Sequence, residues 1–492
     1  MPQDTMTTAI AFVVYLGLML AIGFLAYRRM KSLSDYALGG RRLGPFPVAV
    51  SAGASDMSGW LMLGLPGYAL IAGFEATWIV IGLLVGTWLN WLLVARRLRV
   101  YSAVADDALT LPTYFSNRFR DGSNRLRVAS SLFTLFFFLF YVSAGLVAQG
   151  KLFEAVFDIS YTWAVCLGAI VIVIYVFLGG FLAVSWTDVV QALMIAFALA
   201  LVSLHAMGDV GGWHEVTLAM QDRSPAMLDM WTDAQGNPLS ALTIISLLAW
   251  GLGYFGQPHI LARFKAIRDD RQVATARRIA VSWTFIVLSC ALLTGWVAQS
   301  YLDTSPKDVE TVFIELTHMQ FSPLLTGMLL TAVLAAIMST ADSQLLASAS
   351  IIAEDVYRPF VRPKASAKEL ILVGRLSVAV LAFFAVLLAL NSETSVLQLV
   401  AYAWAGFGAA FGPTVLLSLY WRRMTRSGAL SGILVGGITV VIWKHLDGGI
   451  FDLYEIIPGF ILATIAIFVV SLLTQAPEAF TRHAEAKARE DN

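Results

Sequence analysis

The chain alternates between long apolar runs and short polar segments along its whole length. A helix needs about 20 apolar residues to cross about 30 Å of hydrocarbon, and thirteen runs meet that need. The predicted spans are 7–27, 46–72, 74–95, 125–152, 161–182, 188–208, 240–263, 276–301, 321–353, 370–390, 396–421, 428–444 and 454–475. We therefore expect an all-α polytopic membrane protein with thirteen transmembrane helices.

The composition agrees with this interpretation. Of 492 residues, 58% are hydrophobic and 13% charged, with a mean hydropathy of +0.74, whereas about 25% of a soluble domain is charged. The net charge is zero, so no nucleic-acid partner is predicted. Cys166 and Cys290 lie in apolar spans and imply no disulfide framework. The sequence has no GxxxxGK[ST] phosphate loop, which argues against an ATP-driven pump.

The basic residues predict the orientation. All but four of the 33 lysines and arginines fall in alternate segments between the spans; the exceptions are Lys151, Arg223, Lys307 and Lys444. Lysine and arginine accumulate on the inner side of a membrane, so the N-terminus is predicted outside and the C-terminus inside. The first apolar run has its basic residues after it, which favours an uncleaved span over a signal peptide.

The second span contains a predicted break in its helix. The stretch SAGASDMSGWLMLGLPG covers 51–67 and carries Asp56, and a carboxylate at this depth costs roughly 2.5–3.5 kcal/mol. The neighbouring residues that lower helix propensity are Gly53, Ser55, Ser58 and Gly59. An unwound turn frees carbonyls that suit a small cation and amides that suit a carboxylate. The alternative is a kinked helix in which a neighbouring helix satisfies Asp56.

A second break is predicted five spans later, in AWGLGYFGQPH at 249–259. Paired interrupted helices at matching positions indicate an inverted repeat with a binding site between the halves. The repeats would cover 46–208 and 240–421, within a single transporter domain over 1–492. The segments outside the repeat would be a peripheral helix at 7–27, two more at 428–475 and a cytoplasmic tail at 476–492.

Hydroxyls and a second carboxylate occur together in AAIMSTADS at 335–343. Ser339, Thr340 and Ser343 could bond back to their own helix, or they could join the carbonyls of the first break in one cation site. Asp342 supplies the carboxylate. Asp188, at the start of the predicted sixth span, is equally consistent with a helix N-terminal carboxylate and with an ion ligand.

Aromatic residues mark the second break. Trp250, Tyr254 and Pro258 stand at i, i+4 and i+8, so on an α-helix they form one stripe against which a cationic amine could stack. Tyr141 could add a phenol from the other half, although such stripes usually serve packing. His259 is either a proton relay or a helix-end residue facing the inner vestibule.

Several long motifs, in order from about residue 10 to 475, resemble the solute:sodium symporter family and, within it, the sodium/proline symporters. They are SAGASDMSGWLMLGLPG, ALTLPTYFSNRF, GGFLAVSWTDVVQA, AWGLGYFGQPHILARF and AYAWAGFGAAFGP. The resemblance implies a LeuT-like core of two inverted five-helix repeats, a sodium ion as the co-transported species, and no enzymatic activity.

The resemblance also implies roles for individual residues. The implied sodium ligands are the carbonyls of Ala54, Met57 and Ala336 and the hydroxyls of Ser339 and Thr340. Sodium coupling would involve Asp56, Asp188 and, near the inner face, Arg41. The implied proline-side residues are Ser58, Gly59, Tyr141, Trp250, Tyr254 and Pro258. The stretch 341–343 departs from the best-known proline carriers, so Asp342 has no implied role.

The expected function is uptake of L-proline with sodium across a bacterial inner membrane by alternating access, with no oligomer required. Another solute, such as pantothenate, a different amino acid or a sugar, stays open because the sequence does not reveal pocket shape. A channel is disfavoured by the paired broken helices. A transporter-like sensor would need a signalling domain, and the tail after 475 is short for one.

Overall fold

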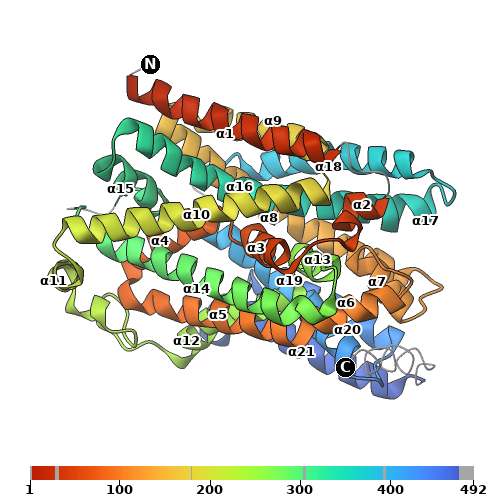
Figure 1. The fold of residues 1–492 in the computed structure, drawn as a ribbon. Helices are drawn as coiled ribbons and strands as arrows, with labels where there is room; N and C mark the ends of the chain where they lie inside the picture. The colour runs from red at the N-terminus through yellow and green to blue at the C-terminus, as the bar shows by residue number, and fades with distance from the viewer. Residues whose placement is uncertain (1–2, 28–32, 179, 303–305, 392–394, 476–492) are drawn as a thin grey trace.

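The computed structural model describes residues 3–27, 33–178, 180–302, 306–391 and 395–475. Over these ranges the chain is helical, and its long helices lie side by side (Figure 1). Isolated β-bridges join Leu43 to Ile267 and Thr232 to Pro238. The predicted tail, 476–492, lies outside the described residues.

One group of helices forms the body of the protein. They are α1 (Gln3–Tyr27), α3 (Pro45–Asp56), α4 (Leu65–Ala72), α5 (Thr77–Asn90), α8 (Arg125–Phe157), α9 (Tyr161–Leu178), α10 (Phe181–Asp209), α12 (Ala241–Leu248), α13 (Pro258–Ala266), α14 (Val273–Ala298), α16 (Pro323–Ile351), α18 (Ala367–Ala389), α19 (Val396–Tyr420), α20 (Arg426–Trp443) and α21 (Ile456–Leu473). The helices in the connections are α2 (Leu33–Leu38), α6 (Arg96–Val104), α7 (Leu111–Arg118), α11 (Trp213–Arg223), α15 (Val312–Gln320) and α17 (Arg358–Phe360).

Ten helical segments of the described chain are long and apolar enough to cross a membrane. One of them, Trp60–Val104, runs through the turn at Gly73, whose φ is +61°. Two further apolar segments, Tyr161–Phe177 and Ala241–Gly256, are shorter. The all-α polytopic class is therefore confirmed, while the number thirteen and the orientation of the termini stay predictions.

Burial separates the centre of the molecule from its edge. Helices α16 and α19 are mostly buried, whereas α1, α18 and α21 bury only one side. Their other sides expose large apolar residues such as Val13, Phe383 and Leu472, as expected for contact with lipid. Figure 1 shows α2, α7 and α17 at one end of the bundle and α11 and α15 at the other.

The first predicted break is present. Helix α3 ends at Asp56, and Met57 departs from helical geometry with ψ 78°. A π-helical turn, η2 (Trp60–Gly64), then leads into α4. A Cβ at Gly59 would lie 2.5 Å from Cβ of Ala148, so this glycine allows the broken segment to approach α8 closely.

The second break has a different geometry from the predicted one. Between α12 and α13 the chain forms a 3₁₀ helix, η6 (Ala249–Gly256). A 3₁₀ helix has three residues per turn, so residues four apart point about 120° apart instead of lining up. The predicted single stripe of Trp250, Tyr254 and Pro258 is therefore wrong, since Pro258 begins the next helix.

The sixth span also differs from its predicted start. Helix α10 begins at Phe181, two turns before the residue predicted as its start. Asp188 is therefore inside the helix and buried, and its interpretation as a helix N-terminal carboxylate is wrong. The sequence SWTD contains typical capping residues, but their apolar surroundings continue the helix through them.

Candidate functional site

The end of α3 meets the middle of α16. The Ser339 hydroxyl donates to the Ala54 carbonyl at 2.8 Å and to the Ala336 carbonyl at 3.0 Å. The Thr340 hydroxyl donates to the same Ala54 carbonyl at 3.3 Å. All four residues are buried. The structure therefore gathers four of the five predicted sodium ligands around one point.

This arrangement has the chemistry of a site for a small hard cation. Carbonyl and hydroxyl oxygens are neutral ligands that such a cation accepts, and a carbonyl near the end of a broken helix has spare acceptor capacity. Met57, the fifth predicted ligand, lies in the break with its side chain buried. Its backbone amide donates to the Gly53 carbonyl at 2.9 Å, while no described contact joins its carbonyl to α16.

Asp56 lies beside this point and connects the two breaks. Its Oδ2 accepts a 2.6 Å hydrogen bond from the phenol of Tyr254. Its backbone carbonyl accepts from Trp60 Nε1 at 3.1 Å and from the Tyr141 phenol at 3.4 Å. Its Oδ1 is buried without a hydrogen-bond partner. A buried carboxylate oxygen without a donor can accept a cation or an amine at little extra desolvation cost.

Aromatic rings surround Asp56 from both halves of the chain. The ring of Trp250 lies 6.2 Å from that of Trp60 and 5.6 Å from that of Tyr454. The ring of Tyr254 contacts Trp404 edge-on at 4.9 Å, and Trp404 Nε1 donates to the Trp250 carbonyl at 2.7 Å. These contacts form a rigid apolar wall next to one carboxylate, which suits a small molecule with an apolar body and an amine.

The remaining predicted proline-side residues have structural roles in this conformation. The Ser58 hydroxyl accepts from the Trp60 amide at 3.5 Å, and Gly59 packs against α8. Pro258 starts α13, where its missing N–H costs nothing. All three are buried. The structure places them on the two breaks but shows no exposed face of theirs toward a ligand.

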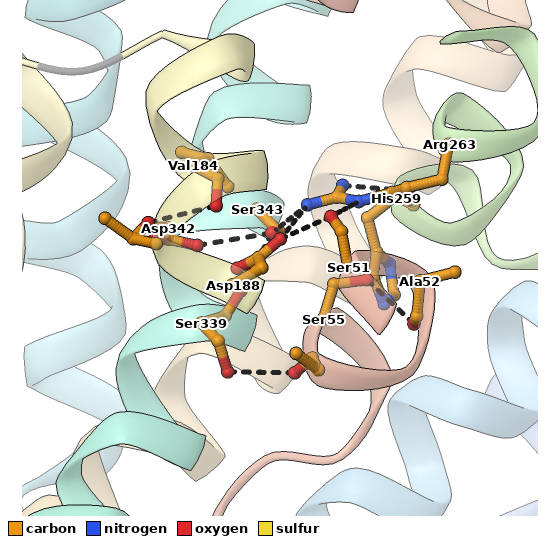
Figure 2. A network of polar contacts seen from close by, with 12 residues as sticks. Ser51, Ala52, Ser55, Val184, Asp188, His259, Arg263, Ser339, Asp342 and Ser343 are labelled. Atoms are coloured by element: carbon orange, nitrogen blue, oxygen red, sulfur yellow. Dashed lines mark hydrogen bonds and ion pairs between the residues drawn. The ribbon is translucent and has the colours of Figure 1, made fainter. Parts of the chain in front are cut away.

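Asp188 lies in a buried polar network on the side of α16 that faces α10 (Figure 2). Its Oδ2 accepts from the Ser51 hydroxyl at 2.6 Å and from Arg263 Nη2 at 3.1 Å. Arg263 also donates to the hydroxyls of Ser51 and Ser343 and, at 2.9 Å, to the His259 carbonyl. The guanidinium thus joins α13 to α3, α10 and α16.

Asp342 and His259 border this network. The carboxylate of Asp342 is fully buried and accepts from the Ser343 hydroxyl at 3.2 Å. His259 is also fully buried, with its ring 5.9 Å from Tyr141 and 5.7 Å from Phe138. The prediction that His259 faces a vestibule is wrong for this conformation, because aromatic rings cover it.

Arg41 lies apart from the sodium ligands, in the 3₁₀ turn η1 (Gly39–Arg41) before α3. Its guanidinium pairs with Asp107 at 2.7 Å and keeps only 9% of its side chain exposed. Burial lowers the pKa of Arg41 to about 10, and Asp107 opposes that shift. Arg41 remains charged at neutral pH, and it can affect sodium only indirectly.

Sequence reasoning missed Arg263, Ser51, Trp60 and Trp404. In the sequence, Arg263 looks like one more basic residue at the inner end of a span. A signal is nevertheless present: Arg263 stands four residues after His259, at the end of the predicted apolar span 240–263, and a charge in such surroundings needs a partner. Its partners come from three other helices, so no local pattern names them.

Comparison with known proteins places this chain among sodium-coupled carriers. The profile of the sodium:solute symporter family matches residues 36–436. The chain is 49% identical to the sodium/proline symporters of Salmonella typhimurium and Escherichia coli, covering 97% of this chain and 95% and 96% of those proteins. It is 48% identical to an osmoregulated proline transporter of Bacillus subtilis, with 94% of each chain covered.

The structural comparison agrees. A sodium-coupled sialic acid symporter in a substrate-bound, outward-open state superposes with a TM-score of 0.78 at 19% identity, covering 96% of this chain and 99% of that one. The nucleobase-cation symporter Mhp1 gives a TM-score of 0.55 at 13% identity, covering 92% and 98%. At these identities the likeness concerns the fold alone. The family profile and the close relatives together show that this chain belongs to the sodium:solute symporter family.

Proposed function

We propose that this protein takes up L-proline together with sodium across the bacterial cytoplasmic membrane. The observation that carries the proposal is the meeting of Ser339 and Thr340 with the Ala54 carbonyl. Ala54 lies two residues before the buried carboxylate of Asp56. The chain is 49% identical to sodium/proline symporters. Proline and sodium are both released chemically unchanged, so the protein is a transporter and not an enzyme.

The membrane topology belongs to the same proposal. The chain would cross the bilayer thirteen times, with the N-terminus outside, the C-terminus inside and a core of two inverted repeats over 46–208 and 240–421. The gathering of α2, α7 and α17 at one end of the bundle supports it, because all three belong to basic segments predicted inside. The two interrupted helices lie at matching positions of the two repeats.

Sodium would bind at the junction of α3 and α16. Its ligands would be the carbonyls of Ala54, Met57 and Ala336 with the hydroxyls of Ser339 and Thr340. In the described conformation these hydroxyls point at the carbonyls, so a bound cation would replace hydrogen bonds that now hold the helices together. Moving one positive charge inward gains about 2.3 kcal/mol per 100 mV of membrane potential.

Proline would bind between the two breaks. Its secondary amine would approach Asp56 and its ring would pack against Trp250 and Tyr254. Its carboxylate would meet amides freed at the start of the second half-helix, as in other carriers with broken helices. Asp56 would thereby connect the amine to the neighbouring sodium site, which gives the two binding events a shared group and hence reciprocal coupling.

The proposal is tested with purified protein in proteoliposomes. An inward sodium gradient should drive accumulation of labelled proline, lithium should replace sodium in part, and a proton gradient without sodium should leave uptake near background. Pantothenate, a second amino acid and a sugar serve as competing solutes in the same assay. Full uptake without sodium would remove the sodium claim, and stronger inhibition by another solute than by proline would remove the proline claim.

A further inference from the structure

The inner ends of both interrupted helices are tied to one short segment, residues 105–110, between α6 and α7. Arg41, four residues before α3, reaches this segment through Asp107 at 2.7 Å and the Ala108 carbonyl at 3.5 Å. Lys265, at the end of α13, reaches it through the Leu109 carbonyl at 2.6 Å. Both residues lie in the basic segments that predict the membrane orientation, and neither touches the proposed sodium ligands.

The two helix ends are also tied to each other. Arg41 Nη1 donates to the Lys265 carbonyl at 3.3 Å. A β-bridge joins Leu43 to Ile267, and the Arg268 amide donates to the Leu43 carbonyl at 2.9 Å. The start of α3 and the end of α13 are therefore bonded to each other, and both are also bonded to the 105–110 segment.

The segment is anchored at its far side to the helix that carries the sodium hydroxyls. Beyond α16 the helix continues as a π-helical turn, η9 (Ile352–Tyr357). Within it Asp355 is buried and accepts from the hydroxyls of Thr110 and Thr113 at 2.6 and 2.7 Å. The helices α3 and α16, which meet at Ala54 and Ser339, are thus joined a second time at their inner ends.

The backbone at the ion pair adopts an unusual conformation. Arg41, Asp106 and Asp107 all have positive φ, of 55°, 52° and 54°. Residues other than glycine rarely take this conformation, although asparagine and aspartate tolerate it best. Such a turn persists only where surrounding contacts hold it, so the ion pair and the turn support each other.

From these contacts we infer that Arg41, Asp107, Ala108, Leu109 and Lys265 form a latch that holds the inner side of the carrier closed, with Asp107 as its positioning residue. This inference rests on the proposed alternating-access function. It would account for the role in sodium coupling that the family resemblance implies for Arg41, a residue that does not touch the proposed sodium ligands. Release of proline and sodium to the inside would require Arg41 and Lys265 to leave the 105–110 segment. While this segment holds α3 and α13, they cannot separate from α16.

Asp106 provides a matched control for Asp107. The two are neighbours, both are exposed and both have positive φ. Asp107→Asn and Asp106→Asn therefore remove the same charge from the same turn with a residue that tolerates its backbone. The reporter is Ala52→Cys, a buried position in α3, in a chain whose Cys166 and Cys290 are changed to alanine. The probe is a membrane-impermeant maleimide added to inside-out vesicles without proline.

Asp107→Asn should raise the labelling rate about two- to fivefold, the range set by loss of a partly exposed ion pair, while Asp106→Asn leaves it unchanged. Arg41→Gln should raise the rate further, because besides the ion pair it loses the hydrogen bonds to the Ser102 hydroxyl and to the carbonyls of Ala108 and Lys265. The double variant Arg41→Gln/Asp107→Asn should label no faster than Arg41→Gln alone. If Asp107→Asn does not reach the membrane, Asp107→Gly serves instead, since glycine also accepts this φ.

Equal labelling of Asp107→Asn and Asp106→Asn would overturn the latch, as would full additivity in the double variant. Faster labelling only in right-side-out vesicles would overturn the placement of the latch on the inner side, and with it the proposed orientation of the chain. The assay needs no proline, so a chain that failed to accumulate proline would contradict the proposed function and leave the labelling result intact.

Discussion

The phenol of Tyr254 donates a 2.6 Å hydrogen bond to Oδ2 of Asp56, across 198 residues of sequence. This bond links the 3₁₀ break η6 directly to the end of α3. Both side chains are buried, so the carboxylate is held in one orientation, with its other oxygen free of hydrogen bonds. The hydrogen bond therefore fixes the position of the carboxylate relative to the aromatic wall.

Tyr254→Phe keeps the ring against Trp404 but removes the donor to Asp56. A hydrogen bond to a charged group contributes about 1.5–3 kcal/mol, so the sodium concentration for half-maximal uptake should rise about tenfold or more. Proline binding at saturating sodium should change by less than about twofold, because ring contacts survive. Tyr114→Phe removes a buried phenol far from the site and is the control. Equal effects of the two variants would contradict the assignment.

Asp56→Asn retains shape and removes the charge. Sodium-driven uptake should fall to near background while the protein inserts normally, because the amide cannot balance a cation and an amine in buried surroundings. The measurement is proline accumulation per unit of protein in the membrane. Asp222→Asn, on the exposed end of α11, should leave uptake unchanged. Wild-type sodium dependence in Asp56→Asn would show that Asp56 has a purely structural role.

Thr340→Val and Trp250→Ala should separate the two sites. Thr340→Val deletes one proposed sodium ligand, so it should raise the sodium requirement, and excess sodium should restore much of the apparent proline affinity. Trp250→Ala removes part of the wall, so proline binding should stay weak at any sodium concentration. Proline binding over a sodium titration checks both. The reverse pattern, with rescue of Trp250→Ala only, would show that the two roles are misassigned.

The ion pair of Asp188 with Arg263 should dominate local stability. Both side chains are at most 1% exposed, and removing one partner of a buried pair costs about 3–5 kcal/mol. Asp188→Asn and Arg263→Gln should each lower the melting temperature in detergent strongly, and the double variant should lose less than the sum. Glu354→Gln breaks the more exposed pair with Arg358 and should change stability by less than about 1 kcal/mol. Additive losses would show that the two residues act independently.

Much of the fold could be predicted because the membrane imposes simple local demands. Apolar runs of sufficient length must be helical, since every backbone group in hydrocarbon needs a hydrogen-bond partner within its own segment. Glycines and a proline in two of these runs therefore mark breaks, and both breaks are present. The resemblance to symporters, which the family profile confirms, also rests on contiguous motifs.

The details of the breaks could not be predicted in the same way. The sequence around Trp250 is equally compatible with an α-helical stripe and with a 3₁₀ turn, and close packing decides between them. Gly251 faces the Gly82 carbonyl, and Gly256 faces the Phe407 carbonyl, at distances that leave no room for a Cβ. A tighter helix at this point is thus a result of neighbours that are remote in sequence.

The sequence by itself determined that the chain is a series of long apolar helices, the places where two of them break and the residue types available at those places, because these follow from local propensity and from the bilayer as a solvent. Only the tertiary structure decided which polar groups meet. Arg263 pairs with Asp188, Tyr254 with Asp56 and Arg41 with Asp107. A buried charge must find a partner, but which helix supplies it depends on how all the helices pack.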